Sequence, residues 1–250
     1  MRLEEAIRDF LSFLRRPKYD QQWAQALSWI TITKLFILVF CIEMLALTSI
    51  SGVVGLDEIP HALESVMDNS SLWAIAALAI ILAPFFEELL FRYDLKYKWL
   101  SILFLFALGC GVLWLLLKAF APDLEQQLMQ NAALITENWF LLSVTVAVFV
   151  VIITIVFMVS QAVPLTFISQ TFPFIFYATA LAFALVHIGN FNTSTVAWYM
   201  TPLLVLPQFI LALYLGYIRM RKNIWSSIYV HSLNNSIPIL LYALVDLGGK

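Results

Sequence analysis

Six polar side chains that could do chemistry together lie in long apolar stretches of the chain. They are two adjacent glutamates, an arginine, two histidines and an asparagine: Glu87, Glu88, Arg92, His187, His231 and Asn235. An ionisable residue inside a membrane helix costs at least about 2.5 kcal/mol on insertion scales, so each needs a reason to be there. Carboxylates and imidazoles held together are the groups that general acid–base catalysis uses. The set is therefore a candidate hydrolytic centre within a membrane.

The two glutamates differ in the partner that the sequence offers them. Arg92 follows Glu88 by four residues, the favourable order for an ion pair on one helical face. Glu87 is rotated by about 100° and lacks that partner, which makes it the candidate general base. Pro84 removes a backbone hydrogen bond one turn earlier and is expected to bend the helix. A purely structural Glu–Arg clasp is the alternative.

The histidines fall on two further apolar stretches. His187 follows Phe183 by four residues, and Asn235 follows His231 by four, so the members of each pair share a helical face. Asn234 points about 100° away from that face. Each pair alone is weak support for a site. Together with Glu87 they form a polar centre that structural needs rarely require in lipid.

The composition places these residues in a membrane protein. Of 250 residues, 62% are hydrophobic and 12% are charged, whereas soluble domains carry about 25% charged residues. This balance excludes a disordered, a nucleic-acid-binding or a disulfide-rich secreted protein. Cys41 and Cys110 fit no disulfide framework, and we expect both to be small buried hydrophobic side chains.

Apolar runs of about 20 residues, the length that crosses a bilayer, recur seven times. They cover residues 27–50, 72–92, 99–120, 139–163, 172–190, 197–218 and 224–246. The predicted fold is all-α: a polytopic helical membrane protein with about seven transmembrane helices and an N-terminal amphipathic helix. We expect residues 1–22 to form that interfacial helix and residues 23–250 a single transmembrane domain.

Charge sets the predicted orientation. In residues 1–17 apolar side chains follow one helical face and four arginines occupy the rest, as in a helix on the membrane surface. Eleven basic residues fall on the side of the N-terminus and two on the other, which predicts a cytoplasmic N-terminus. Lys34 and Glu43 lie on opposite faces of the first crossing and cannot pair. We expect them to serve tilt, snorkelling or contacts between helices.

The motifs at 87–92, 183–187 and 231–235, in this order on membrane helices, resemble the CPBP family. This family comprises the type II CAAX prenyl proteases and the bacteriocin-processing, Abi-like proteins. The resemblance covers residues 84–238, with Tyr93 where the family usually has glycine. The step of 100 residues from Glu87 to His187 exceeds the usual spacing, so we expect two inserted crossings at 99–120 and 139–163.

The resemblance implies an intramembrane endopeptidase of a bacterial plasma (inner) membrane, acting on a membrane-associated peptide or protein. The substrate would be of the CAAX type, or a bacteriocin or signal peptide. Glu87, assisted by His187, would activate water, and His231 with Asn235 would form the oxyanion hole, without a cofactor. Glu88 and Arg92 would hold the helix of Glu87. The alternative is a zinc protease with Glu87, His187 and His231 as ligands.

Two other classes of function stay open from the residues alone. The buried glutamate and histidines could form a proton relay in a small transporter, or the chain could be a catalytically silent scaffold or immunity protein. Counting along the crossings places Glu87 near the cytoplasmic face and His187 deeper. A shared site therefore requires a displaced or tilted fifth crossing, or a water-filled cavity.

Overall fold

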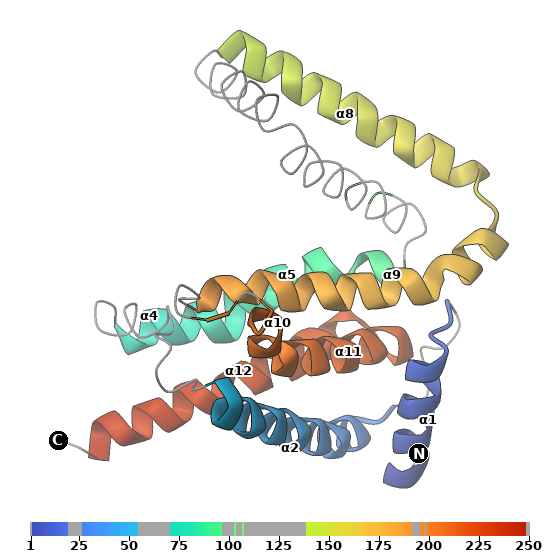
Figure 1. The fold of residues 1–250 in the computed structure, drawn as a ribbon. Helices are drawn as coiled ribbons and strands as arrows, with labels where there is room; N and C mark the ends of the chain where they lie inside the picture. The colour runs from blue at the N-terminus through green and yellow to red at the C-terminus, as the bar shows by residue number, and fades with distance from the viewer. Residues whose placement is uncertain are drawn as a thin grey trace. The chain divides into compact units, whose positions relative to one another are not determined.

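The computed structural model describes residues 2–19, 27–54, 71–96, 139–191 and 199–248, with positions 103, 107, 196 and 197. Every element in these ranges is a helix, which confirms the all-α class (Figure 1). The chain divides into two compact units, Met1–Lys96 with Thr171–Lys250, and Tyr97–Gln170. Apart from positions 103 and 107, the predicted crossing at 99–120 lies outside the described residues, as does Cys110.

All the candidate catalytic residues belong to the first unit. Its elements are α1 (Leu3–Arg15), α2 (Trp29–Val54), α4 (Leu72–Ala76), η2 (Ala77–Leu82), α5 (Ala83–Arg92), η3 (Asp94–Lys96), most of α9 (Leu165–Val186), η4 (His187–Asn190), α10 (Thr201–Leu204), α11 (Leu206–Arg221) and α12 (Ile224–Gly248). Of these, η2 is a π-helix, and η3 and η4 are 3₁₀-helices. The second unit contains α8 (Trp139–Ala162), whose exposed side chains include Val148, Val150 and Ile155.

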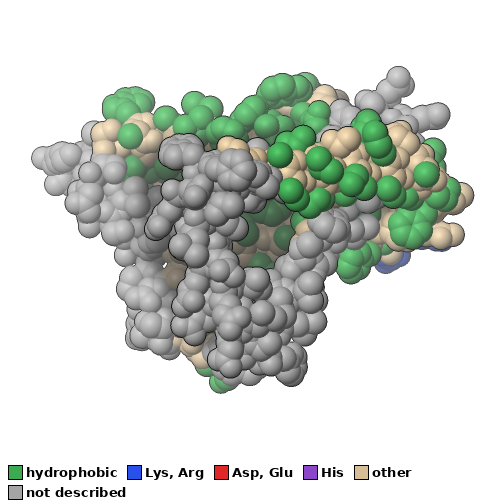
Figure 2. Space-filling view, turned by 90° about the horizontal axis from the view of Figure 1, so that it is seen from above, with side chains coloured by type: hydrophobic (Ala, Val, Ile, Leu, Met, Phe, Trp, Pro, Cys, Tyr) green, Lys and Arg blue, Asp and Glu red, His purple; other side chains and the backbone are tan. Residues whose placement is uncertain are grey.

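Three helices in the described ranges are long and apolar enough to cross a membrane: Trp29–Gly52, Leu72–Lys96 and Leu165–Asn190. They coincide with the predicted crossings 27–50, 72–92 and 172–190, and they fit an integral membrane protein. Hydrophobic side chains also cover most of the described surface in Figure 2. Helices α8 and α12 cover the predicted crossings 139–163 and 224–246, but neither is among these three candidate spans. Seven crossings therefore stay a prediction.

The predicted crossing 197–218 is not one helix. It is divided at Val205, whose backbone (φ −107°, ψ 13°) separates α10 from α11. Pro202 and Pro207 each occupy the first turn of one of these helices. A proline is tolerated there because the amide hydrogen that it lacks has no partner within the helix. Hydropathy alone does not reveal this division.

Helix α11 forms the centre of the first unit, since eleven of its sixteen residues are buried. The Tyr214 hydroxyl donates to Ile32 O of α2 over 2.7 Å. On another face, a Cβ atom at Gly216 would stand 2.7 Å from Cε2 of Phe176 in α9. Glycine at this position therefore lets α11 and α9 approach closely.

Helix α1 is attached to this centre by an aromatic and an ionic contact. The Phe10 ring lies 4.9 Å from the Tyr217 ring, and Phe13 is buried. Asp9 accepts hydrogen bonds from Arg221 at 2.7 and 2.6 Å and from the Tyr217 hydroxyl at 2.7 Å. Part of the apolar face of α1 thus contacts protein. The interfacial position of this helix stays a prediction.

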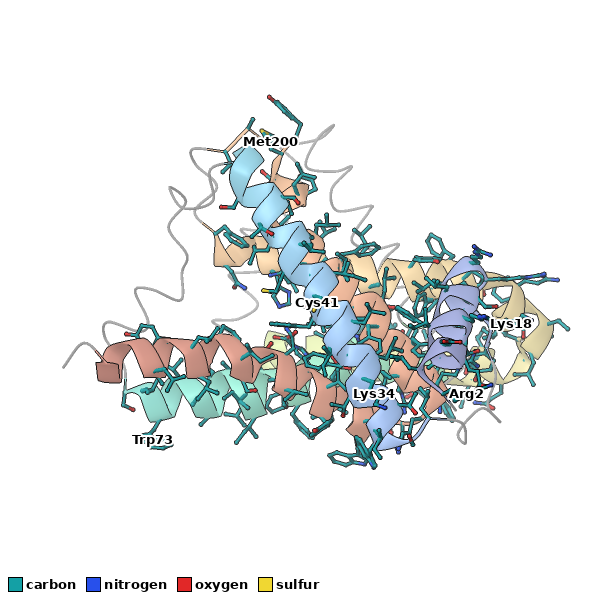
Figure 3. The ribbon with its side chains drawn as sticks, turned by 90° about the horizontal axis from the view of Figure 1, so that it is seen from below. Arg2, Lys18, Lys34, Cys41, Trp73 and Met200 are labelled. Atoms are coloured by element: carbon teal, nitrogen blue, oxygen red, sulfur yellow. The ribbon has the colours of Figure 1, made fainter. Side chains whose placement is uncertain are left out.

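Helix α2 presents different residues on its two sides (Figure 3). Glu43 is 2% exposed and Lys34 is exposed, which confirms that they occupy opposite faces. The prediction of a buried Cys41 is wrong, because this side chain is exposed. A thiol is apolar enough to face lipid as well as a protein core.

Candidate active site

Helices α5, α9 and α12 bring the three sequence motifs together. Phe91 of α5 packs edge-on against Phe183 of α9, with ring centroids 5.6 Å apart. One turn away, Glu87 reaches His187, so the two helices run antiparallel at this contact. Helix α12 lies beside η2 and α5 (Figure 3), and its contacts with them bring His231 to the two glutamates.

Glu88 is the fully buried centre of a polar network. Its side chain is 0% exposed, and Oε1 lies 3.3 Å from Arg92 Nη1 and 3.0 Å from His231 Nδ1. Its other oxygen accepts a hydrogen bond from the Ser227 hydroxyl. The predicted pairing with Arg92 is present, and two residues of α12 join it. Burial of a charge is tolerable only with such partners.

Arg92 is held on its other side by an aromatic ring. Its guanidinium carbon lies 3.8 Å from the centre of the Phe183 ring, and the Arg92 side chain is 2% exposed. A cation over an aromatic face gains more when water is excluded. The Arg92 carbonyl accepts a hydrogen bond of 3.0 Å from Arg219 Nε. Phe183 therefore has a role that the sequence motif did not specify.

Both histidines direct the same nitrogen toward Glu87. His187 Nδ1 lies 2.7 Å from Phe183 O, and His231 Nδ1 lies 3.0 Å from the Glu88 carboxylate. A carbonyl and a carboxylate can only accept, so each Nδ1 carries the hydrogen. The Nε2 atoms then stand 3.8 Å (His187) and 3.7 Å (His231) from Glu87 Oε2.

Glu87 occupies the point where these nitrogens converge. Its side chain is 28% exposed, yet Oε2 is buried and accepts no hydrogen bond from any residue in the described ranges. The two distances to Nε2 exceed a direct hydrogen bond, and contacts of this length raise the question of an intervening water. An uncommitted carboxylate oxygen facing two imidazoles is the arrangement that a general base needs.

Asn235 lies one turn beyond His231 and contacts the segment before Glu87. Its Nδ2 donates to Ala79 O in η2 over 2.9 Å. Asn235 is thereby linked to Glu87 through the backbone of η2 and α5. One amide hydrogen of Asn235 is therefore committed to the backbone.

Ser227 is the member of the site that the motifs did not identify. It precedes His231 by four residues on α12 and is 0% exposed. The helix starts beside Asn223, whose side chain accepts from the Ser226 backbone N–H over 2.9 Å, the usual form of an N-terminal cap. The i,i+4 spacing to His231 was the available signal in the sequence, because such residues share a face.

The depth difference between Glu87 and His187 is met by a displacement of the helices along their axes. His187 stands three residues before the end of the span Leu165–Asn190, and Glu87 nine residues before the end of Leu72–Lys96. Antiparallel spans in register would hold these residues far apart. Their contact at 3.8 Å therefore requires the two helices to be displaced along their axes. How deep this contact lies in the membrane stays a prediction.

The donor set also bears on a metal. Glu87, His187 and His231 are the two-histidine, one-glutamate combination of known catalytic zinc sites, and both histidines have the Nδ1 partners that zinc ligands commonly have. Within the described ranges, no group of three or more His, Cys, Asp and Glu side chains is arranged to hold a metal ion. The residue types of Glu87, His187 and His231 suit zinc, but their side chains as described are not arranged as a metal site.

Comparison with known proteins gives one match. The model of the family described as type II CAAX prenyl endopeptidase Rce1-like matches residues 69–237, more than half of the chain and all three motifs. No curated protein and no solved structure matches the chain. Helices that converge on a glutamate and two histidines, and a family model that spans all of them, lead to one conclusion: this chain belongs to the type II CAAX prenyl endopeptidase Rce1-like family.

Proposed function

We propose that this protein is a glutamate-type intramembrane endopeptidase that cleaves a membrane-associated CAAX-type peptide or protein. Family membership supports an intramembrane protease of the CAAX type. The observation that carries the finer proposal is the buried Oε2 of Glu87, uncommitted among the described residues and facing two Nε2 atoms at 3.8 and 3.7 Å. No feature of the described residues specifically favours the transporter or the silent scaffold.

In this mechanism a water molecule binds between Glu87 and His187. Glu87 Oε2 accepts one proton from the water, and the lone pair of His187 Nε2 accepts a hydrogen bond from its second hydrogen. The water oxygen attacks the carbonyl carbon of the scissile bond, and the carbonyl oxygen becomes an oxyanion. The proton held by Glu87 then passes to the leaving amine as the C–N bond breaks.

The oxyanion needs hydrogen-bond donors, and we assign one of them to His231. Because Glu88 accepts from Nδ1, His231 can donate from Nε2 only in its doubly protonated form. The buried Glu88 carboxylate at 3.0 Å stabilises that cation. The second amide hydrogen of Asn235 is the other proposed donor. Removal of one such donor costs about 10²- to 10³-fold in kcat in other enzymes.

Zinc is the competing proposal for the same residues. Glu87, His187 and His231 would hold the ion, which would act as a Lewis acid and lower the pKa of a bound water to about 7. The glutamate-type mechanism is preferred here because, within the described ranges, no group of three or more His, Cys, Asp and Glu side chains is arranged to hold a metal ion.

From the charge bias we further propose a cytoplasmic N-terminus, and from the resemblance a bacterial inner membrane.

The test uses purified protein in lipid nanodiscs, with a fluorogenic farnesylated CAAX peptide as the probe and the same peptide without the prenyl group for comparison. We expect Glu87→Gln and His187→Ala each to lower kcat by at least about 100-fold, since each removes a group that acts on the water. Glu43→Gln is the matched control, because it changes a buried glutamate on α2 and should retain activity.

A chelator arm separates the two mechanisms. Full activity after treatment with 1,10-phenanthroline supports the glutamate mechanism, whereas loss that zinc restores supports the metal. Turnover by Glu87→Gln at the wild-type rate would refute both. Cleavage of the peptide regardless of the prenyl group would move the substrate assignment to other membrane-associated peptides.

A further inference from the structure

The hydrogen bond from Asn235 to Ala79 O fixes α12 against the segment that precedes Glu87. This segment, η2, is a π-helix over Ala77–Leu82. π-helical turns are rare and frequently occur at functional sites. The bond measures 2.9 Å and is partly buried. It joins the motif at 231–235 to the segment just before the motif at 87–92.

The π register of η2, together with Pro84, leaves the Ala79 carbonyl without a backbone donor. In η2 the backbone hydrogen bonds span five residues, as the Ala83 N–H to Leu78 O bond shows. The same register would assign the N–H of residue 84 to Ala79 O, and residue 84 is proline, which has no N–H. A partly buried backbone acceptor needs another partner. The amide of Asn235 is that partner.

The π-helical turn also determines which glutamate faces which partner. Each residue rotates an α-helix by about 100°, so one residue more or less before Pro84 turns all of α5 by that angle. Glu88 would then leave His231 and Ser227, and Glu87 would leave the two Nε2 atoms. A contact that holds η2 in its π form therefore holds both glutamates in their places.

We propose that Asn235 is a positioning residue, whose amide replaces the backbone donor that Pro84 lacks and so fixes the rotation of the helix that carries Glu87. The bond also orients the amide plane of Asn235 and leaves its second hydrogen for the oxyanion. The catalytic consequence rests on the proposed function, whereas the bond and its effect on η2 do not.

The test restores the missing donor. Pro84→Ala supplies an N–H at the position that serves Ala79 O, so it should compensate for the loss of the Asn235 amide. The variants are Asn235→Ala, Pro84→Ala and the double variant. Asn235→Asp keeps the size but removes the Nδ2 donor. Asn234→Ala is the matched control, since it removes a neighbouring amide whose Oδ1 accepts no hydrogen bond in the described part of the chain.

The first readout is independent of activity and uses the Glu87→Gln background in nanodiscs. We expect amide hydrogen exchange in the segment 79–86 to be faster by about tenfold or more in Asn235→Ala and Asn235→Asp, since local opening lowers protection. The double variant with Pro84→Ala should return close to the parent rate, and Asn234→Ala should not change it. Unchanged exchange in Asn235→Ala, or no recovery in the double variant, overturns the inference.

The second readout is cleavage of the farnesylated peptide by otherwise wild-type protein. We expect Asn235→Ala to lower kcat by about 10³-fold or more with little change in KM, because it removes an oxyanion donor (about 10²- to 10³-fold) and the positioning bond together. Pro84→Ala should restore about tenfold, the share due to positioning, and leave the share due to the oxyanion. Slow turnover with normal exchange in 79–86 would assign Asn235 to the oxyanion alone, which overturns the inference and leaves the proposed function intact. Normal turnover by Glu87→Gln would remove the proposed function while the exchange result stands.

Discussion

The charge cluster around Glu88 makes a quantitative prediction about stability and catalysis together. Glu88→Gln preserves the shape of the side chain and removes its charge. Arg92, which is 2% exposed, then loses the carboxylate 3.3 Å from its Nη1 atom. Removing one partner of a buried ion pair costs about 3–5 kcal/mol, because the other charge stays buried and uncompensated. A cation over the Phe183 ring recovers only part of this.

The expected shift in melting temperature follows from that figure. For a chain of this size 1 kcal/mol corresponds to about 2–4 °C, so Glu88→Gln should lower the apparent Tm by about 6–20 °C. Replacing both partners of a buried pair by uncharged groups is often neutral. The double variant Glu88→Gln/Arg92→Met should therefore recover most of the loss in Tm.

Catalysis separates the two roles of Glu88. Its carboxylate accepts from His231 Nδ1 at 3.0 Å. The amide oxygen introduced by Glu88→Gln can still accept this bond, but no substitution of Arg92 restores the negative charge beside His231. The double variant should be stable and still slower than wild type by about 100-fold, the cost of an impaired oxyanion donor. Thermal unfolding in nanodiscs and peptide cleavage measure the two effects. Full activity in the stable double variant would refute the role assigned to Glu88.

Two further substitutions test the packing that supports the site. Gly216→Ala places a methyl group 2.7 Å from Cε2 of Phe176, whose ring is 1% exposed and cannot move aside. It should cost about 1–3 kcal/mol, seen as a lower apparent Tm, and an unchanged Tm would refute the close approach of α11 and α9. Asp9→Asn removes the carboxylate that binds Arg221 at 2.6 Å, and the 30% exposure of Asp9 reduces the expected cost to about 1–3 kcal/mol. Trypsin should then cleave faster in residues 15–18 at the end of α1, with kcat unchanged; wild-type resistance would contradict the anchoring role.

The sequence predicted the parts of this protein that depend on local pattern. Apolar length identified three helices that can cross a membrane, and the order of the motifs indicated the family. The i,i+4 spacing of Glu88 and Arg92 predicted their contact, because this spacing closes a pair within one helix whatever surrounds it. The opposite faces of Lys34 and Glu43 followed in the same way.

The exposure of Cys41 and the division of the crossing at Val205 were not predictable in this manner. Exposure to lipid and burial in protein favour the same apolar residue types, so hydropathy does not distinguish them. The break before α11 depends on where two prolines fall relative to a helix start. Pattern counting at the scale of 20 residues does not resolve such a detail.

The composition of the chain and the spacing of its residues indicated that it is helical and that it enters a membrane. They also indicated which six polar residues were candidates for a catalytic site. Only the tertiary structure decided that His231 and Ser227 bind Glu88, that both Nε2 atoms face Glu87, and that Asn235 bonds to the carbonyl freed by Pro84. The physical reason is that these contacts join helices more than 90 residues apart along the chain. Their existence depends on the axial displacement and rotation of whole helices, which no local pattern encodes.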